Sequence, residues 1–109
     1  MRFYLTLILL AITYQAVGET KYGVFDVSNN IGTVSSKPAI VHGVYINVAT
    51  SAHTVIIKDG ATEVFTIPAS ATAGNYYSFD EAEFATNLVV DPDDSATGKI
   101  TVLFEDFAQ

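Results

Sequence analysis

The sequence predicts a single all-β domain, either an antiparallel β-sandwich or a jelly-roll-like fold of seven to eight short strands. Short runs rich in β-branched and aromatic residues are separated by turn residues along most of the chain. No run keeps an apolar period near 3.6, so the sequence predicts no amphipathic helix. The 109 residues are too few for two domains that each have a core. We therefore divide the chain into an apolar N-terminal arm or leader, residues 1–18, and a β-sandwich domain, residues 19–109.

The first 18 residues have two interpretations. A basic Arg2, an apolar stretch over residues 5–12 and a small Gly18 before Glu19 are typical of a secretory signal peptide. Tyrosines and threonines interrupt the apolar run, however, and they favour a β-strand or extended arm. The stretch is shorter than the about 20 residues of a membrane span, so we expect no membrane contact in the mature form. If it is an arm, it offers a subunit interface made of Phe3, Tyr4, Leu5, Leu7 and Leu9.

Strands are predicted in the first half of the domain at residues 23–28 and 39–50, with a polar connection at 33–38. In the longer run, apolar residues recur at even positions, and Gly43 inside it indicates a bulge or a close backbone approach. These even positions are Ile40, Val44, Ile46 and Val48.

The clearest hairpin joins residues 53–58 to residues 62–68. Asp59-Gly60 lies between them and supplies the positive φ of a tight turn. Beyond it we predict a strand at 75–79, an acidic turn at 80–83, and a pair of strands at 84–91 and 99–106.

Composition limits the function. Hydrophobic residues make up 50% of the chain and charged residues 16%, against about 25% in a typical soluble domain. With so few charges, an exposed apolar patch that contacts a partner is expected. The 12 acidic and 5 basic residues give a net charge of -7, which argues against nucleic-acid binding. The absence of cysteine excludes disulfides and thiolate metal sites.

The sequence contains no motif for catalysis. There is no Gly-x-Ser-x-Gly and no phosphate-binding glycine loop, so we predict neither an enzyme nor a cofactor. The two histidines, His42 and His53, are interpreted as half-exposed strand residues. Asp91, Asp93 and Asp94 are candidate Ca²⁺ ligands, although their loop lacks the glycine spacing and final Glu of an EF-hand. Turn formation is the alternative interpretation of this loop.

Four segments of the sequence together carry a resemblance. They are HGVYIN at 42–47, KDG at 58–60, FTIPAS at 65–70 and TGKITV at 97–102. In this combination the chain resembles small virion structural proteins of tailed bacteriophages, over residues 38–106. The resemblance implies a structural role as a head decoration or cement protein, or as a tail or fibre component, and it brings no catalytic residues.

We therefore expect a non-enzymatic virion protein, favoured as a capsid decoration or cement subunit that stabilises the particle through subunit contacts. The resemblance implies the major capsid protein as a partner and a homo-oligomer, with a trimer favoured. A first alternative is a secreted β-sandwich binding module, cleaved between Gly18 and Glu19 and able to bind Ca²⁺. A second alternative is a filament subunit that donates residues 1–18 as a strand to its neighbour.

Overall fold

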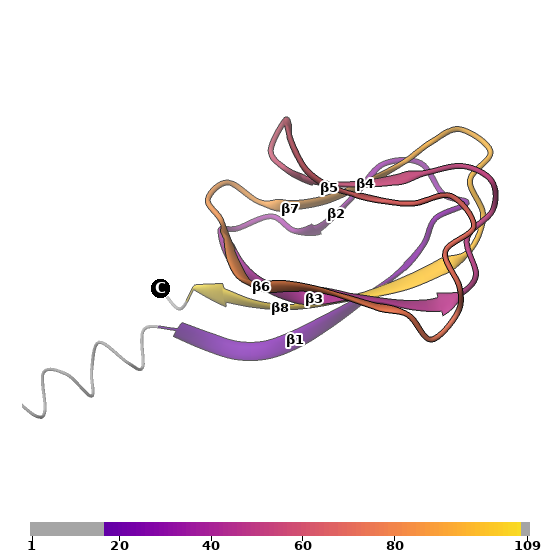
Figure 1. The fold of residues 1–109 in the computed structure, drawn as a ribbon. Coiled ribbons are helices and arrows are strands. Elements are labelled where there is room, and N and C mark those ends of the chain that lie inside the picture. Colours follow the sequence, from indigo (N-terminus) through magenta and orange to yellow (C-terminus); the bar gives the residue numbers. More distant parts are fainter. Residues whose placement is uncertain (1–16, 108–109) are drawn as a thin grey trace, which may run out of the picture.

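The computed structural model describes residues 17–107, which form eight β-strands (Figure 1). Their bounds are β1 Val17–Asp26, β2 Gly32–Ser35, β3 Ala39–Val48, β4 Val55–Asp59, β5 Thr62–Ile67, β6 Tyr76–Phe84, β7 Leu88–Pro92 and β8 Lys99–Phe107. The predicted all-β class is confirmed. In the part of the chain that the structure describes, no helix is long and apolar enough to cross a membrane.

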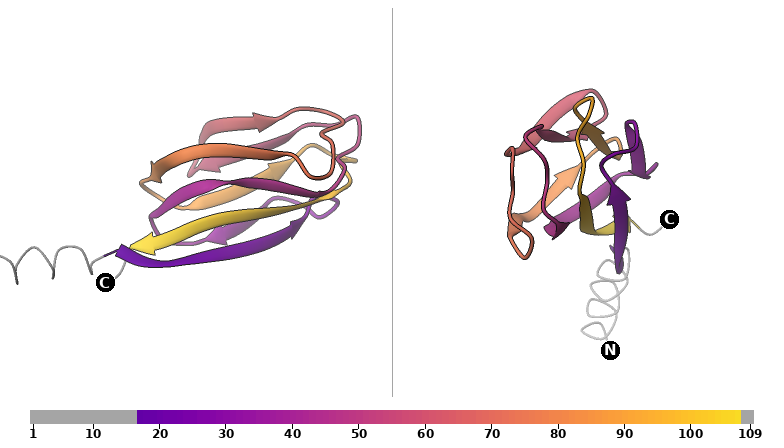
Figure 2. Two further views of the ribbon diagram at one scale, coloured as in Figure 1. Left: turned by 60° about the horizontal axis from the view of Figure 1, so that its bottom comes forward. Right: turned by 90° about the vertical axis from the view of Figure 1, so that its right-hand side faces the viewer.

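The strands make two antiparallel four-stranded sheets that face one another (Figures 1 and 2). Sheet A has the order β1-β8-β3-β6, and sheet B has the order β2-β7-β4-β5. Every connection between successive strands crosses from one sheet to the other, except the β4–β5 turn, which stays in sheet B. Eight strands in this order form a jelly roll, one of the two architectures that the sequence predicted.

The core lies between the two sheets because alternate residues of each strand point inward. In β3, Val44 and Ile46 are fully buried, whereas Tyr45 between them is exposed. The same alternation in other strands gives a continuous apolar core, whose largest fully buried side chains are Phe84, Ile46, Ile57, Ile67, Leu88 and Ile100.

Apolar side chains close both open sides of the sandwich, and one side has an ion pair and hydrogen bonds in addition. Between the edge strands β5 and β6, the Phe65 ring packs at 5.4 Å from the Tyr77 ring and 5.3 Å from the Phe79 ring, measured between centroids. At the side of β1 and β2, where Phe25 and Val34 pack against the core, polar contacts are added. There the Asp106 carboxylate binds the Lys21 ammonium at 2.9 Å and the Ser35 hydroxyl at 2.6 Å.

Two sequence predictions about glycines are confirmed. Gly43 lies at an irregularity where the pairing of β3 with both neighbours shifts register, and the Tyr76 ring approaches it closely. Gly60 has a φ of +61° and closes the predicted tight turn between β4 and β5.

Three predictions about strands are wrong. Part of the polar connection at 33–38 is β2, which pairs with β7 because cross-strand bonding does not need apolar side chains. The acidic residues 80–83 do not end a strand: Asp80 and Glu81 adopt positive φ as a bulge, and β6 continues to Phe84. The segments 84–91 and 99–106 do not pair, because β7 and β8 belong to different sheets.

The predicted N-terminal interface lies outside the described residues. Phe3, Tyr4, Leu5, Leu7 and Leu9 all precede Val17, where the described part begins. The division of the chain at residue 18 therefore stays a prediction, although β1 starts one residue before that boundary.

Candidate functional site

An apolar band crosses the outer face of sheet A. Its members are the exposed apolar side chains of three of the four strands, with exposed fractions of 72% for Tyr22, 57% for Val24, 40% for Tyr45, 52% for Val48 and 46% for Tyr76. We call these five residues the outer apolar band. They make up five of the seven large apolar residues that are exposed in the described part of the chain, so the distribution is one-sided.

Strand register brings the band together from distant parts of the sequence. Val24 of β1 and Tyr45 of β3 both pair with Thr101 of β8, and Tyr45 pairs with Tyr76 of β6 on its other side. Directly paired residues point to the same face of a sheet. This row therefore spans all four strands on the side away from the core.

The Tyr76 ring can lie in this position because residue 43 is a glycine. A Cβ at position 43 would collide with the Tyr76 ring and would lie 2.5 Å from the Tyr77 carbonyl oxygen. The absence of a side chain at Gly43 thus lets Tyr76 lie against the outer face of the sheet. Gly43 has a role in this surface as well as in the fold.

A polar margin lies beside the band on the same face. His42 of β3 and Glu105 of β8 form a hydrogen bond of 2.7 Å between Nε2 and Oε2, and both side chains are mostly shielded from solvent. Thr101 donates a hydrogen bond to the Asn47 side-chain oxygen at 2.7 Å. His42 and Glu105 beside the band, and Thr101 within its row, therefore already have partners within the chain.

Sheet B presents a different outer face. Lys58 of β4 and Asp91 of β7 form an ion pair there, with Nζ and Oδ2 2.6 Å apart. The hydrogen bond from Lys58 to Asp91 raises the pKa of the lysine. The outer face of sheet B thus carries an ion pair, whereas the outer face of sheet A carries exposed tyrosine and valine side chains. The two faces therefore suit partners of different polarity.

The Asp106 carboxylate joins the two sheets at the side of β1 and β2. The hydrogen bond from the Ser35 hydroxyl lowers its pKa, burial raises it, and the bond from Lys21 lowers it further, so that the net direction is down. Ser35 is one of two buried polar residues in the described part, and it also accepts a bond from the Lys37 amide at 3.3 Å. This arrangement fastens β8 to β2 and needs no ligand.

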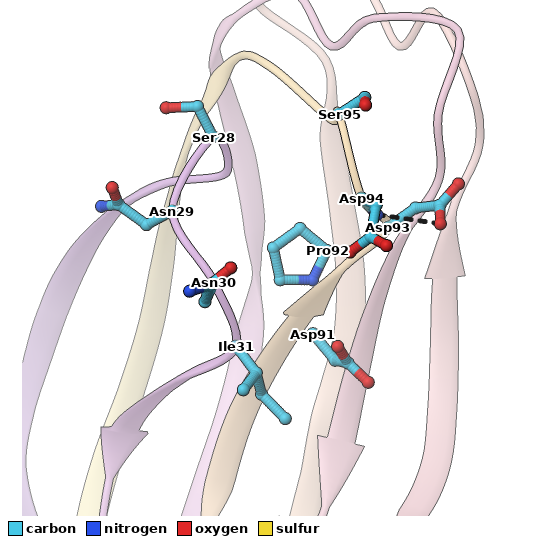
Figure 3. A pocket seen from close by; sticks show the side chains of 9 residues that line it. All are labelled: Ser28, Asn29, Asn30, Ile31, Asp91, Pro92, Asp93, Asp94 and Ser95. Carbon is cyan, nitrogen blue, oxygen red and sulfur yellow. Dashed lines mark hydrogen bonds between the residues drawn. The ribbon is translucent and has the colours of Figure 1, made fainter.

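The candidate calcium residues line a hollow at one end of the sandwich (Figure 3). Its volume is about 420 Å³, and it lies between the loop that joins β1 to β2 and the loop that joins β7 to β8. Most of its lining is polar, with the side chains of Ser28, Asn29, Asn30, Asp91, Asp93, Asp94 and Ser95.

The carboxylates of Asp91 and Asp93 have separate partners in this hollow. Asp91 pairs with Lys58, and Asp93 accepts bonds from the His53 ring at 3.0 Å and from the Asp94 amide at 2.9 Å. Within residues 17–107, no group of three His, Asp or Glu side chains is placed to hold a metal ion. The calcium interpretation therefore gains no support from the geometry, and the turn interpretation accounts for the contacts of Asp93.

Sequence reasoning did not identify the residues of the outer apolar band as a surface. The available signal was the pattern of β3, in which Tyr45 falls between the buried Val44 and Ile46. An apolar residue on the polar side of an alternating strand indicates an exposed contact. Comparisons with known protein families, curated proteins and solved structures gave no match to this chain.

Proposed function

We propose that this protein is a non-enzymatic virion structural protein of a tailed bacteriophage, a decoration or cement subunit that binds the major capsid protein. The observation that carries the proposal is the outer apolar band on one side of a small jelly roll. The four segments that resemble phage virion proteins support the same conclusion. The residues of the band are proposed as the surface that meets the capsid.

The size of the band suits repeated weak contacts. With about 150–250 Å² per tyrosine side chain, the exposed parts of the five residues come to roughly 450 Å². Burial at about 25 cal/mol per Å² gives about 11 kcal/mol, which is similar to the about 4–15 kcal/mol lost on association. A single contact of this kind binds weakly. Many copies on a symmetric particle, each joined to its neighbours, hold more firmly than one.

The charge of the protein fits a coat component. A net charge of -7 on 109 residues favours solubility and opposes non-specific aggregation before assembly. Because the polar side chains at the margin of the band, such as His42 and Glu105, are bonded to each other, they do not need the partner to neutralise them. We therefore expect binding to the capsid to depend only weakly on salt.

The test uses virions from the natural source. The proposal predicts that purified particles contain this chain at a fixed ratio to the major capsid protein, measured by intact-mass spectrometry and quantitative gel analysis. A chain absent from particles, or recovered only from the medium and beginning at Glu19, contradicts the proposal.

A substitution tests whether the outer apolar band is the surface that binds the capsid. Particles stripped of the protein should rebind the recombinant chain and should fail to rebind Tyr45→Lys. Val64→Lys is the matched control, because Val64 has a similar exposed fraction, 45%, but belongs to β5 of sheet B. Equal rebinding of both variants would remove the band from the interface.

A further inference from the structure

The two sheets have four edge strands, and three of them are poor templates for pairing with another chain. β2 has only four residues, with a register shift inside its pairing to β7. β5 has six residues and is followed by Pro68. β6 has nine residues, but Asp80 and Glu81 interrupt it with φ values of 55° and 60°. Short strands, prolines and charged bulges are the features by which native proteins block edge pairing.

β1 has none of these features over most of its length. It is ten residues long, and its pairing with β8 is regular from Thr20 to Asp26. It forms the margin of sheet A, with β8 on one side and no strand of residues 17–107 on the other (Figure 2). An open and regular edge of this length presents a row of backbone N–H and C=O groups to a further strand.

Two successive outward side chains of this edge, Tyr22 and Val24, are apolar, and Thr20 and Asp26 lie on either side of them on the same face. Tyr22 is the most exposed large apolar residue of the described chain, and Val24, two positions further along, is also more than half exposed. Both point outward, since they pair with Leu103 and Thr101 and the intervening Val102 of β8 is fully buried. An open edge that also carries exposed apolar side chains is suited to strand addition.

We propose that two copies of this protein pair through their β1 strands, antiparallel and with the two-fold axis at Tyr22. The two four-stranded sheets A then form one sheet of eight strands. In this register Tyr22 lies opposite Tyr22 of the second copy, and Thr20 lies opposite Val24. Aromatic and β-branched residues are favourable cross-strand neighbours.

Neighbouring registers are less favourable. An axis at Lys21 places two lysines directly opposite one another, which is destabilising. An axis at Gly23 leaves the central position of the pair without a side chain and places Lys21 opposite Phe25. In the Tyr22 register Lys21 lies opposite Gly23, where it has room.

Lys21 is the charged residue of this edge that lies next to the proposed axis and could oppose pairing. A lysine that points inward on an edge strand commonly blocks association. Here its ammonium group lies 2.9 Å from the Asp106 carboxylate, so its charge is already matched within the chain. The edge is thus not protected by an unpaired charge.

This inference does not depend on the virion role, because it concerns the isolated protein. It also differs from the trimer that the resemblance implies, since a two-fold contact of this kind makes a dimer. The mass in solution separates the two: twice the monomer mass of 11.7 kDa supports the pairing, and a monomer or a trimer at all soluble concentrations overturns it.

Single cysteines test the register, because the natural chain has none. A disulfide needs Cβ atoms about 3.5–4.5 Å apart. Under mild oxidation of the full chain, Tyr22→Cys should cross-link to itself. Thr20→Cys and Val24→Cys should not cross-link alone but should do so when mixed in equal amounts. Absence of these cross-links, or equal cross-linking of the control Val64→Cys, overturns the proposal.

A lysine introduced into β1 tests how much this strand contributes to the affinity of the dimer. Val24→Lys places a lysine on each copy near the axis and should raise the dimer dissociation constant by about 30-fold, measured by sedimentation equilibrium. Val48→Lys and Val64→Lys are matched controls with similar exposure on other strands, and they should leave the constant unchanged. A dimer that Val24→Lys does not weaken, while its circular dichroism spectrum is normal, overturns the pairing through β1.

Discussion

The Asp59 carboxylate fastens the β4–β5 turn to the loop that leads from sheet A to sheet B. Its two oxygens accept hydrogen bonds from the backbone N–H groups of Ala85 at 2.9 Å, Thr86 at 2.8 Å and Asn87 at 3.4 Å. Asn87 returns a contact, since its side-chain oxygen accepts a bond from the Gly60 amide at 2.8 Å. Removal of the carboxylate therefore leaves three donors of one loop without their acceptor.

The expected cost of Asp59→Ala follows from these bonds. Hydrogen bonds to charged groups contribute about 1.5–3 kcal/mol when well buried. Asp59 is only partly shielded, so we take about 1 kcal/mol for each good bond and less for the long one. The free energy of unfolding should fall by about 2–3 kcal/mol, a large fraction of the about 5–15 kcal/mol of a typical domain. Urea unfolding followed by circular dichroism at pH 7 measures it.

The pH dependence separates this role from simple loss of a side chain. Burial acts to raise the pKa of Asp59, and the bonds from Thr86, Ala85 and Asn87 lower it by more, so the pKa lies below its usual 3.8. The unfolded chain then binds the proton more readily than the folded chain does. The stabilisation is thus complete above about pH 4 and is lost as the pH falls through the lowered pKa.

Asp59→Asn should therefore be less stable than wild type by a constant amount between pH 5 and pH 7. The difference in the free energy of unfolding between wild type and Asp59→Asn should become smaller below about pH 4. The control is Asp94→Asn, since the Asp94 side chain is exposed and accepts no hydrogen bond from the described residues. The reasoning would be refuted if this difference stayed the same at low pH, or if Asp59→Asn lost no more stability than Asp94→Asn.

Three further substitutions test the packing and the turns. Gly43→Ala should lower the free energy of unfolding by about 1–3 kcal/mol, because the new Cβ meets the Tyr77 carbonyl as well as the Tyr76 ring; an unchanged melting temperature would contradict this. Gly60→Val should cost about 1–3 kcal/mol, because β-branched residues are strained at a φ of +61°, and Gly60→Asn should cost less in the same thermal melt. Phe84→Ala should cost about 3–5 kcal/mol in urea unfolding, because Phe84 is among the largest fully buried side chains; a loss below 1 kcal/mol would show that the site is not packed as described.

The parts of the fold that could be predicted depend on local chemistry. Asp59-Gly60 marks the tight turn because glycine adopts positive φ easily, as Gly60 does here, and the structure places the turn between β4 and β5. Strand order could not be predicted. β8 pairs with β1, some 80 residues away along the chain, and no local pattern specifies such a partner.

The site could not be predicted because bulges change which face a residue occupies. The sequence placed Ile40, Val44, Ile46 and Val48 on one side of a strand. The structure buries Val44 and Ile46 but exposes Val48, since the pairing of β3 with β8 shifts register on either side of that pair. A shift by one residue moves a side chain to the opposite face. Even spacing in the sequence therefore does not show which of these residues share a face in the structure.

The glycines in the segments that carry the phage resemblance have structural roles. Gly43 and Gly60 allow close approach and a tight turn, as described above. In the last segment, Gly98 has a φ of +128°, and a Cβ there would lie 2.9 Å from the Ala49 carbonyl oxygen.

These positions specify how the chain folds. Of the outer apolar band, Tyr22 and Val24 on β1 lie outside residues 38–106, over which the resemblance runs. The resemblance therefore does not cover the β1 part of the surface proposed to meet the partner. The identity of the partner is therefore to be sought with variants of the band and of the β1 edge, and the resembling segments are to be kept intact while this is done.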